Sequence, residues 1–246
     1  MKNISLTIQY LGTNYCGFQR QKNGLSVQEV LEEAIFEATN EKVSLTPSGR
    51  TDAGVHALGQ VANFMYGGSI PTSKLKIVIN QHLPKDIRVV DAKERDLNFN
   101  ARKSAKKKTY LYKIYTGEIM SVFDEDRVLH YPRQLDIKLL NKCAKALVGE
   151  HNFSSYVASG ASTSTTVRTI YSATFEQDGE YLYFHITGNG FLYNMVRILV
   201  GTMLEVGTHK RTFESFEKSL LGGKRSDVGR TAKACGLYLE SVEYEK

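Results

Sequence analysis

The chain has 246 residues, of which 41% are hydrophobic and 24% are charged, so it is long enough for one large domain or two small ones of ordinary globular composition. It contains no apolar run of the roughly 20 residues that span a membrane, and its three cysteines and six histidines are too scattered to predict disulfides or a metal site. The formal net charge of +6 favours an anionic partner. We therefore expect a cytoplasmic protein that binds no metal.

The first part of the chain alternates strand and helix signals. Residues 4–10 alternate apolar and polar side chains, which predicts a strand and not a signal peptide. Over residues 26–39 the apolar positions recur at helical spacing, and Ser26 and Glu29 have the spacing of a capping box, so a helix is expected to start at Ser26. A strand over residues 60–66, a short helix over 73–82 and a strand over 87–91 are expected next.

A second series of elements is expected from about residue 105 onward. It comprises a strand over residues 109–115, a helix over 136–147, strands over 168–176 and 180–187, helices over 191–206 and 212–221, and a strand over 236–244. Asp136 can cap the first of these helices and Gly149 can close it. The dipeptide Asp178-Gly179 is typical of a hairpin turn between the two middle strands.

The segment over residues 191–206 is apolar on nearly every side, which predicts a helix buried on both faces. Gly201 within it would allow another segment to approach closely. The two series of elements together predict an α+β fold with two domains, residues 1–104 and 105–246, each a sheet backed by helices. We find no sequence repeat between the halves, so any similarity between them would be structural only.

A basic run precedes a group of tyrosines. Six basic residues and no acidic one occur between Ala101 and Lys113: Arg102, Lys103, Lys106, Lys107, Lys108 and Lys113. Taken alone, such a run is as typical of a solvated loop as of a binding site. However, Tyr110, Tyr112 and Tyr115 follow in a strand, and cations beside aromatic rings suit single-stranded or looped RNA.

Residues 49–60, GRTDAGVHALGQ, describe a tight loop before a strand. The simplest interpretation is a turn in which Asp52 bonds neighbouring backbone N–H groups. Arg50, two residues earlier, would instead keep the carboxylate of Asp52 ionised, as a nucleophile or base must be. A metal bound by Asp52 and His56 would need more ligands than the neighbourhood offers, and we interpret His56 as a packing residue.

The segment GRTDAGVHA is similar to the signature of the TruA-type tRNA pseudouridine synthases, so the sequence resembles this family. The resemblance extends over the whole chain. The other segments that carry it are YLGTNYCGFQRQ, LSVQEVLEEAI, GQVANF, LPKDIRV, FNARKSAKKKTYLY, GEHNFSSY, GFLYNMVRILVGTMLEVG and GLYLESVEY. The sequence departs from the family pattern at five positions outside the matched site residues: Leu11, Phe18, Asn100, Lys103 and Lys233.

The resemblance implies roles for five residues. Asp52 matches the catalytic aspartate, and Arg50 matches an arginine that enters the RNA stem where the target base leaves. Tyr110 matches a tyrosine that stacks on the target uracil. Arg197 matches a basic residue that pairs with the aspartate, and Leu192 matches an apolar wall of the uracil pocket. Without the resemblance, Tyr110 would be interpreted as an ordinary strand aromatic. Arg197 could be a surface side chain, but its helix is apolar on every side, which favours a buried partner such as a carboxylate.

The same resemblance implies a fold and partners. It implies two ferredoxin-like halves that form a continuous, mainly antiparallel sheet, with the active site in a cleft between them. The substrate would be uridine 38, 39 or 40 in the anticodon stem-loop of tRNA, bound by a homodimer, with Arg102, Lys106, Lys107 and Lys108 as RNA contacts. No cofactor is needed, and Gly-Asn-Gly at residues 188–190 lacks the rest of a dinucleotide-binding fingerprint.

Two other functions are also compatible with the sequence. The first is a catalytically silent tRNA-binding or chaperone protein of the same fold. The second is a hydrolase that uses Asp52 as nucleophile on a small phosphorylated substrate. For the isomerase itself, the sequence leaves open whether Asp52 attacks the sugar, attacks the base or removes a C2′ proton.

Overall fold

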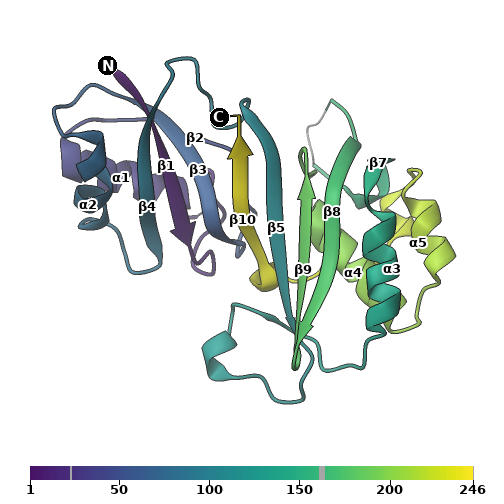
Figure 1. Ribbon diagram of the computed structural model, residues 1–246. Coiled ribbons are helices and arrows are strands. Elements are labelled where there is room, and N and C mark those ends of the chain that lie inside the picture. The colour runs from purple at the N-terminus through teal and green to yellow at the C-terminus, as the bar shows by residue number, and fades with distance from the viewer. Residues whose placement is uncertain (23, 161–163, 246) are drawn as a thin grey trace. The chain divides into compact units, whose positions relative to one another are not determined.

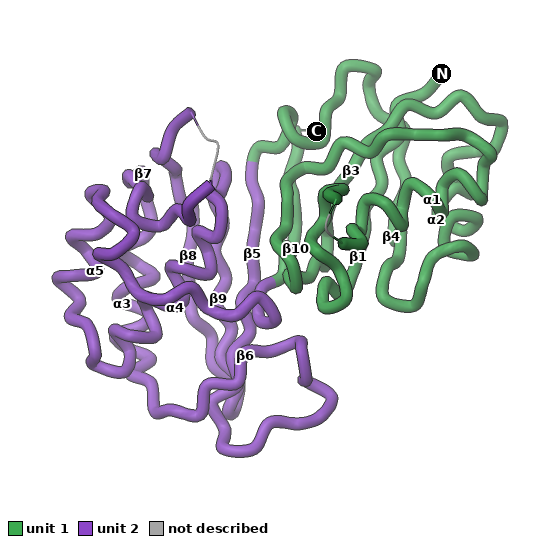
Figure 2. Tube along the Cα trace, turned by 180° about the vertical axis from the view of Figure 1, so that it is seen from behind, with its two compact units in different colours: residues 1–106, 238–246 green, residues 107–237 purple. Residues whose placement is uncertain are grey.

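Ten strands and five α-helices occur in residues 1–22, 24–160 and 164–245, the parts of the chain that this computed structural model describes. They belong to two compact units (Figure 2): unit 1 contains residues 1–106 and 238–246, and unit 2 contains residues 107–237. The predicted α+β class is confirmed, and most strand pairs are antiparallel.

Unit 1 is a sheet covered by two helices on one face (Figure 1). Its elements are β1 (Lys2–Tyr10), α1 (Val27–Thr39), β2 (Thr46–Pro47), β3 (His56–Tyr66), α2 (Thr72–Asn80), β4 (Ile87–Arg95) and β10 (Leu237–Tyr244). β1 lies between β4 and β3 and is antiparallel to both, whereas β10 pairs with β3 in parallel. Ile4, Leu6 and Ile8 of β1 have no exposed surface, so this strand lies at the centre of the core.

The face of this sheet that carries Asn3 and Asn63 is tied to the segment before the basic run. Asn3 Nδ2 donates to the carbonyls of Asp96 and Phe99, and the Asn63 side chain joins Asn3 to the N–H of Ala101. Both asparagines are buried, and these bonds satisfy their polar atoms. The chain is therefore fixed at Ala101, immediately before Arg102.

In unit 2, four strands pair in the order β5-β9-β8-β7, each antiparallel to its neighbour. The elements of this unit are β5 (Ala105–Tyr115), β6 (Leu129–His130), α3 (Ile137–Ala146), β7 (Gly149–Asn152), β8 (Val167–Asp178), β9 (Tyr181–Gly188), α4 (Met195–Gly207) and α5 (Phe213–Ser219). Along β9, Leu182, Phe184 and Ile186 are buried, and the residues between them are partly exposed. This period of two is that of a sheet with one covered face, and α3 packs on β8 at that sheet.

The two predicted N-terminal caps and the hairpin turn are confirmed, whereas the helix after Asp136 ends at Ala146 with Leu147 as its C-cap, and Gly149 is the first residue of β7. Ser26 Oγ accepts the N–H of Glu29 at 3.2 Å, and Asp136 Oδ1 accepts the N–H of Leu139 at 2.9 Å. Each bond satisfies an N–H group that has no partner inside its helix. Gly179 has a φ of 58° in the hairpin between β8 and β9, a conformation that glycine adopts without strain.

Two differences from the sequence prediction concern the long elements. The final strand, predicted in the second domain, pairs with β3, so residues 238–246 belong to unit 1, and the division near residue 105 falls after Lys106. The buried helix starts at Met195 and not at Phe191, because Asn194 has a left-handed φ of 60° that ends helical geometry there. Its burial is as predicted, with ten of its 13 residues buried.

Within the described residues, no helix has both the length and the apolar character needed to cross a membrane.

Candidate active site

The loop that carries Asp52 lies in unit 1 immediately before β3. Its backbone is paired with the segment after β1: Gly17 and Asp52 form an antiparallel bridge, and the N–H of Phe18 donates to the Thr51 carbonyl at 3.1 Å. The Thr51 hydroxyl lies 2.7 Å from the buried hydroxyl of Tyr10. The N–H of Val55 donates to the Asp52 carbonyl at 3.1 Å, so the predicted turn is present in the backbone.

Two glycines permit this close pairing. Gly17 has a φ of 115°, and a Cβ built on it would lie 2.6 Å from the Thr51 carbonyl oxygen. A Cβ on Gly12 would overlap the carbonyl oxygen of Val55. Any larger residue at either position would therefore displace the loop on both sides of Asp52. Neither glycine was predicted as a site residue, although both stand in YLGTNYCGF, one of the segments that carried the resemblance.

The other end of the loop is fixed by buried polar side chains. His56 is fully buried, and its Nδ1 accepts the N–H of Gly12 at 2.9 Å. Gln60 Nε2 donates to the Gly49 carbonyl at 2.9 Å, and Gln60 Oε1 accepts the hydroxyl of Ser48 at 2.6 Å. His56 therefore packs and orients the loop, as the sequence analysis interpreted it, although it is the first residue of β3.

The two charged residues of this loop differ in exposure. Arg50 is exposed to solvent, whereas Asp52 is half-buried. A loop that is hydrogen-bonded at Gly49, Thr51 and Val55 holds the Asp52 backbone in place while part of its side chain can be reached from outside. Such fixed placement is what a catalytic carboxylate requires.

In unit 2, Tyr110 and the residues before α4 form an aromatic and apolar cluster. The Tyr110 side chain, on β5, is 9% exposed, and its ring contacts that of Phe191 edge to face, with 5.0 Å between the ring centres. Leu192, the next residue, is buried. Because the helix starts only at Met195, both Phe191 and Leu192 lie in the connection between β9 and α4.

Arg197 lies in the first turn of α4, half-buried, in a fixed position. Its Nε donates to the Ala232 carbonyl at 2.8 Å, and its Nη1 donates to Asn194 Oδ1 at 2.7 Å. The N–H of Ala232 returns a bond to the Arg197 carbonyl at 3.0 Å. These bonds orient the guanidinium, but Arg197 is in unit 2 and Asp52 in unit 1, so their pairing stays a prediction.

The basic run is divided between the two units. Arg102 is exposed, and Lys106 Nζ lies 2.7 Å from Glu245 Oε1 in unit 1. In unit 2, Lys107 Nζ lies over the ring of Tyr171, 5.3 Å from its centre, and Lys108 is half-buried on β5 opposite Gly188. The run thus holds an ion pair and a cation–π contact, although its exposed members remain accessible to RNA.

Three departures from the family pattern have structural roles. Asn100 Oδ1 accepts the N–H groups of Arg102 and Lys103 at 3.0 Å each, which forms a turn before β5. Phe18 is fully buried against Tyr10. The Lys233 carbonyl accepts the hydroxyl of Tyr112 at 2.6 Å, and its side chain is exposed.

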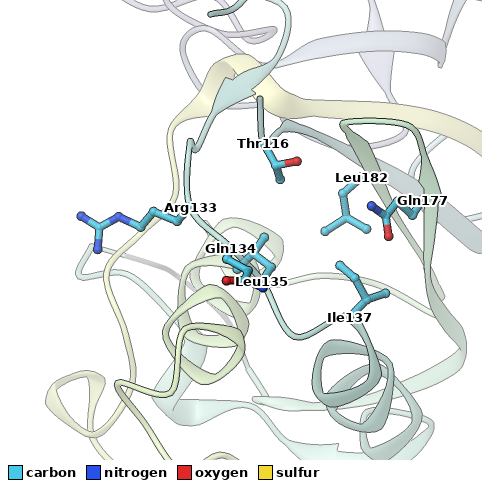
Figure 3. A pocket seen from close by; sticks show the side chains of 7 residues that line it. All are labelled: Thr116, Arg133, Gln134, Leu135, Ile137, Gln177 and Leu182. Atoms are coloured by element: carbon cyan, nitrogen blue, oxygen red, sulfur yellow. The ribbon is translucent and has the colours of Figure 1, made fainter. Parts of the chain in front are cut away.

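Two other features bear on the chemistry of the protein: metal-binding clusters and a cavity in unit 2. Among the described residues, no group of three His, Cys, Asp or Glu side chains could hold a metal ion. A cavity of about 220 Å³ in unit 2 is lined by Thr116, Arg133, Gln134, Leu135, Ile137, Gln177 and Leu182. Figure 3 shows the guanidinium of Arg133 directed away from the other six side chains, so no acid or base points into this cavity.

Comparison with known proteins identifies the family. The profile of the tRNA pseudouridine synthase family matches residues 6–126 and 143–245, which include the loop of Asp52 and the cluster around Tyr110 and Arg197. The chain belongs to this family. This synthase is 44% identical to tRNA pseudouridine synthase A of Acetivibrio thermocellus over 244 residues, which cover 99% of the chain and 100% of the relative.

Two further relatives give the same assignment. The enzyme of Caldicellulosiruptor saccharolyticus is 46% identical over 246 residues, and that of Clostridium kluyveri is 43% identical over 244 residues. Each match covers 99% of this chain and 100% of the relative, and both relatives are named tRNA pseudouridine synthase A. The resemblance to the TruA type is therefore confirmed, and the synthase is an isomerase.

Proposed function

We propose that this synthase converts uridine to pseudouridine at position 38, 39 or 40 of the tRNA anticodon stem-loop, with Asp52 as the catalytic carboxylate. The observation that carries the proposal is the Asp52 loop, which Tyr10, Gly12 and Gln60 hold by hydrogen bonds while the carboxylate stays half-buried. A catalytic group that is already held in position before the substrate binds needs little free energy of reorganisation during the reaction. The family membership supplies the reaction class.

The target base must leave the RNA stem before Asp52 can reach its sugar. Extruding a base costs a few kcal/mol, and stacking on an aromatic ring returns about 1–3 kcal/mol. The exposed Arg50 would occupy the space that the base leaves, and Tyr110 would stack on the uracil. Leu192, buried beside Phe191, would form the apolar wall of the uracil pocket, and Arg197 would pair with the Asp52 carboxylate.

The isomerisation breaks the C1′–N1 bond, turns the uracil and joins C5 to C1′, and the proton lost from C5 is balanced by one gained at N1. No electron donor, acceptor or cofactor enters this balance. Asp52 can serve as nucleophile towards the sugar or the base, or as base towards the C2′ proton, and all three require its ionised form.

The synthase is proposed to be a cytoplasmic homodimer that binds one tRNA across both subunits. Sedimentation equilibrium in the absence of RNA would then give twice the chain mass of 27.6 kDa. A mass of 27.6 kDa at every protein concentration would contradict this part of the proposal.

The direct test of the reaction is nucleoside analysis of an unmodified tRNA transcript after incubation with the protein. We expect uridine to decrease and pseudouridine to increase by the same amount, with no free uracil. Bound tRNA without pseudouridine would instead indicate a silent RNA-binding protein. Release of phosphate from small phosphorylated compounds would indicate a hydrolase.

The stacking role of Tyr110 is tested by two substitutions. Tyr110→Ala removes the ring and should lower kcat/KM by about 5- to 150-fold, which corresponds to the 1–3 kcal/mol of one stacked base. Tyr110→Phe keeps the ring and its contact with Phe191, so it should remain within a few-fold of the wild type. Equal activity of the alanine variant and the wild type would exclude stacking by Tyr110.

The basic run is tested by Lys106→Ala and Lys107→Ala. Each should weaken tRNA binding more at low salt than at high salt, because neutralising a phosphate releases counterions. Lys106 should have the smaller effect, since Glu245 already compensates its charge. The target position should not change. Unchanged affinity of both variants at low salt would remove these lysines from the RNA footprint.

A further inference from the structure

A basic groove of about 530 Å³ lies on unit 2, beside α4. The loop over residues 229–233 forms one side, and Leu129, Tyr131 and Arg133 come from β6 and the segment after it. Leu129 and Leu204 supply apolar surface in the groove. None of its residues is among those that the sequence resemblance assigned to catalysis or RNA binding.

Four cations line this groove: Arg133, Lys210, Arg230 and Lys233. All four are exposed, and among the described residues none has a carboxylate within ion-pair distance. The only acidic residue in the lining is Glu205. Its Oε2 lies 3.3 Å from Arg211 Nε, and its Oε1 accepts the backbone N–H of Arg230 at 3.2 Å. The groove therefore has an excess of positive charge that the protein itself does not balance.

The backbone behind two of these cations is fixed to α4. The Arg230 carbonyl lies so close to Gly201 that any Cβ there would overlap it. The N–H of Gly229 donates to the Thr202 hydroxyl at 3.0 Å, and Ala232 exchanges two bonds with Arg197. The side chains of Arg230 and Lys233 thus extend from a fixed backbone. Because this backbone is already ordered, binding a ligand here costs less conformational entropy.

Arg133 reaches the groove from a different segment, the one after β6. Its guanidinium points away from the small neighbouring cavity in Figure 3 and lies over the ring of Tyr131, 5.7 Å from its centre. Tyr131 is half-buried, and arginine beside an aromatic ring, with lysines around it, is the combination that binds both the phosphates and the unstacked bases of RNA.

The position of the groove along α4 relates it to the proposed active site. Gly201 and Glu205 follow Arg197 by four and eight residues, which corresponds to about 6 Å and 12 Å along a helix. We propose that this groove binds the phosphate backbone of the RNA substrate a few nucleotides away from the target uridine. The inference rests on the proposed function, because it takes Arg197 as part of the uridine site.

The test compares Arg230→Ala/Lys233→Ala with a control of equal charge change, Lys138→Ala/Lys145→Ala. The control lysines are exposed on α3 and line neither cavity. All variants carry Asp52→Ala as well, so that turnover is slow while tRNA binding is measured over a series of salt concentrations. The groove variant should bind about tenfold more weakly in moderate salt, and its slope of log affinity against log salt should be smaller by about 2, one for each lost phosphate contact.

A charge-conserving variant, Arg230→Lys/Lys233→Arg, should keep the affinity and slope of its parent and so exclude a folding defect as the cause. Affinity and slope equal to those of the control would overturn the inference. A change of oligomeric mass with unchanged RNA binding would also overturn it, and would make the groove a protein interface.

The proposed function can fail separately. It fails if the wild type binds tRNA but forms no pseudouridine. The groove comparison remains valid in that case, because it measures tRNA binding and not product formation. If the wild type forms pseudouridine and the groove variant binds like the control, only the inference about the groove is wrong.

Discussion

Replacing Asp52 by alanine should lower the rate of pseudouridine formation by about 10²–10⁴-fold, the usual contribution of a side chain that takes part in the chemical step. Affinity for tRNA should be nearly unchanged, because the backbone of the loop is held by bonds that do not involve the Asp52 side chain. Those bonds include Phe18 N–H to the Thr51 carbonyl and Gly12 N–H to His56. The measurement is the single-turnover rate with enzyme in excess over the tRNA transcript.

Asp52→Asn is the sharper variant, since it keeps the shape of the side chain and removes only its charge. Asp91→Asn is the matched control: it removes a carboxylate from unit 1 that is 2.9 Å from Lys93 on β4. The control should react at the wild-type rate. If Asp52→Asn also reacts at that rate, Asp52 is not the catalytic carboxylate.

Replacing Gly201 by alanine should destabilise the protein by about 1–3 kcal/mol, the usual cost of overfilling a packed interior. The new methyl group would overlap the Arg230 carbonyl, which is backbone and cannot rotate away. The loop over residues 229–233 would have to move from α4, and the bonds between Ala232 and Arg197 would be strained or lost. Thermal unfolding should show a midpoint lower by roughly 5 °C.

The loop displacement should also reduce catalysis, because Arg197 would lose the bond that orients its guanidinium. Gly67→Ala serves as the control, since a Cβ there meets only the Glu41 carboxylate at 3.5 Å, an ordinary contact. Its unfolding midpoint should remain close to that of the wild type. If Gly201→Ala and Gly67→Ala unfold at the same midpoint, the loop over residues 229–233 can move away from α4 without loss of stability, and this prediction is wrong.

Local sequence patterns predicted the long elements well. The helix after Ser26 and the helix after Asp136 were found because apolar spacing and a capping side chain agree. The short strands β2, β6 and β7, of two to four residues, have too few positions to show a period. The pairing of β10 with β3 joins residues far apart in the chain, which no local pattern encodes.

Only part of the candidate site could be predicted, because local patterns do not show contacts between distant segments. Asp52 and Arg50 stand in one short motif, so the sequence could identify them together. Gly12 and Gly17 support that motif from another segment, and only their contacts show why they must be glycines. The cations of the basic groove come from separate parts of unit 2, so they form no charge run that sequence analysis could detect.

Mapping the modified position on the RNA tests directly whether this synthase modifies tRNA at position 38, 39 or 40. An unmodified tRNA transcript with uridine at all three positions is incubated with the wild-type protein and treated with a reagent that marks pseudouridine. We expect marks at one or more of positions 38–40 and nowhere else, and far fewer marks after the same incubation with Asp52→Ala. Marks only at other positions, or none with the wild type, would contradict this expectation.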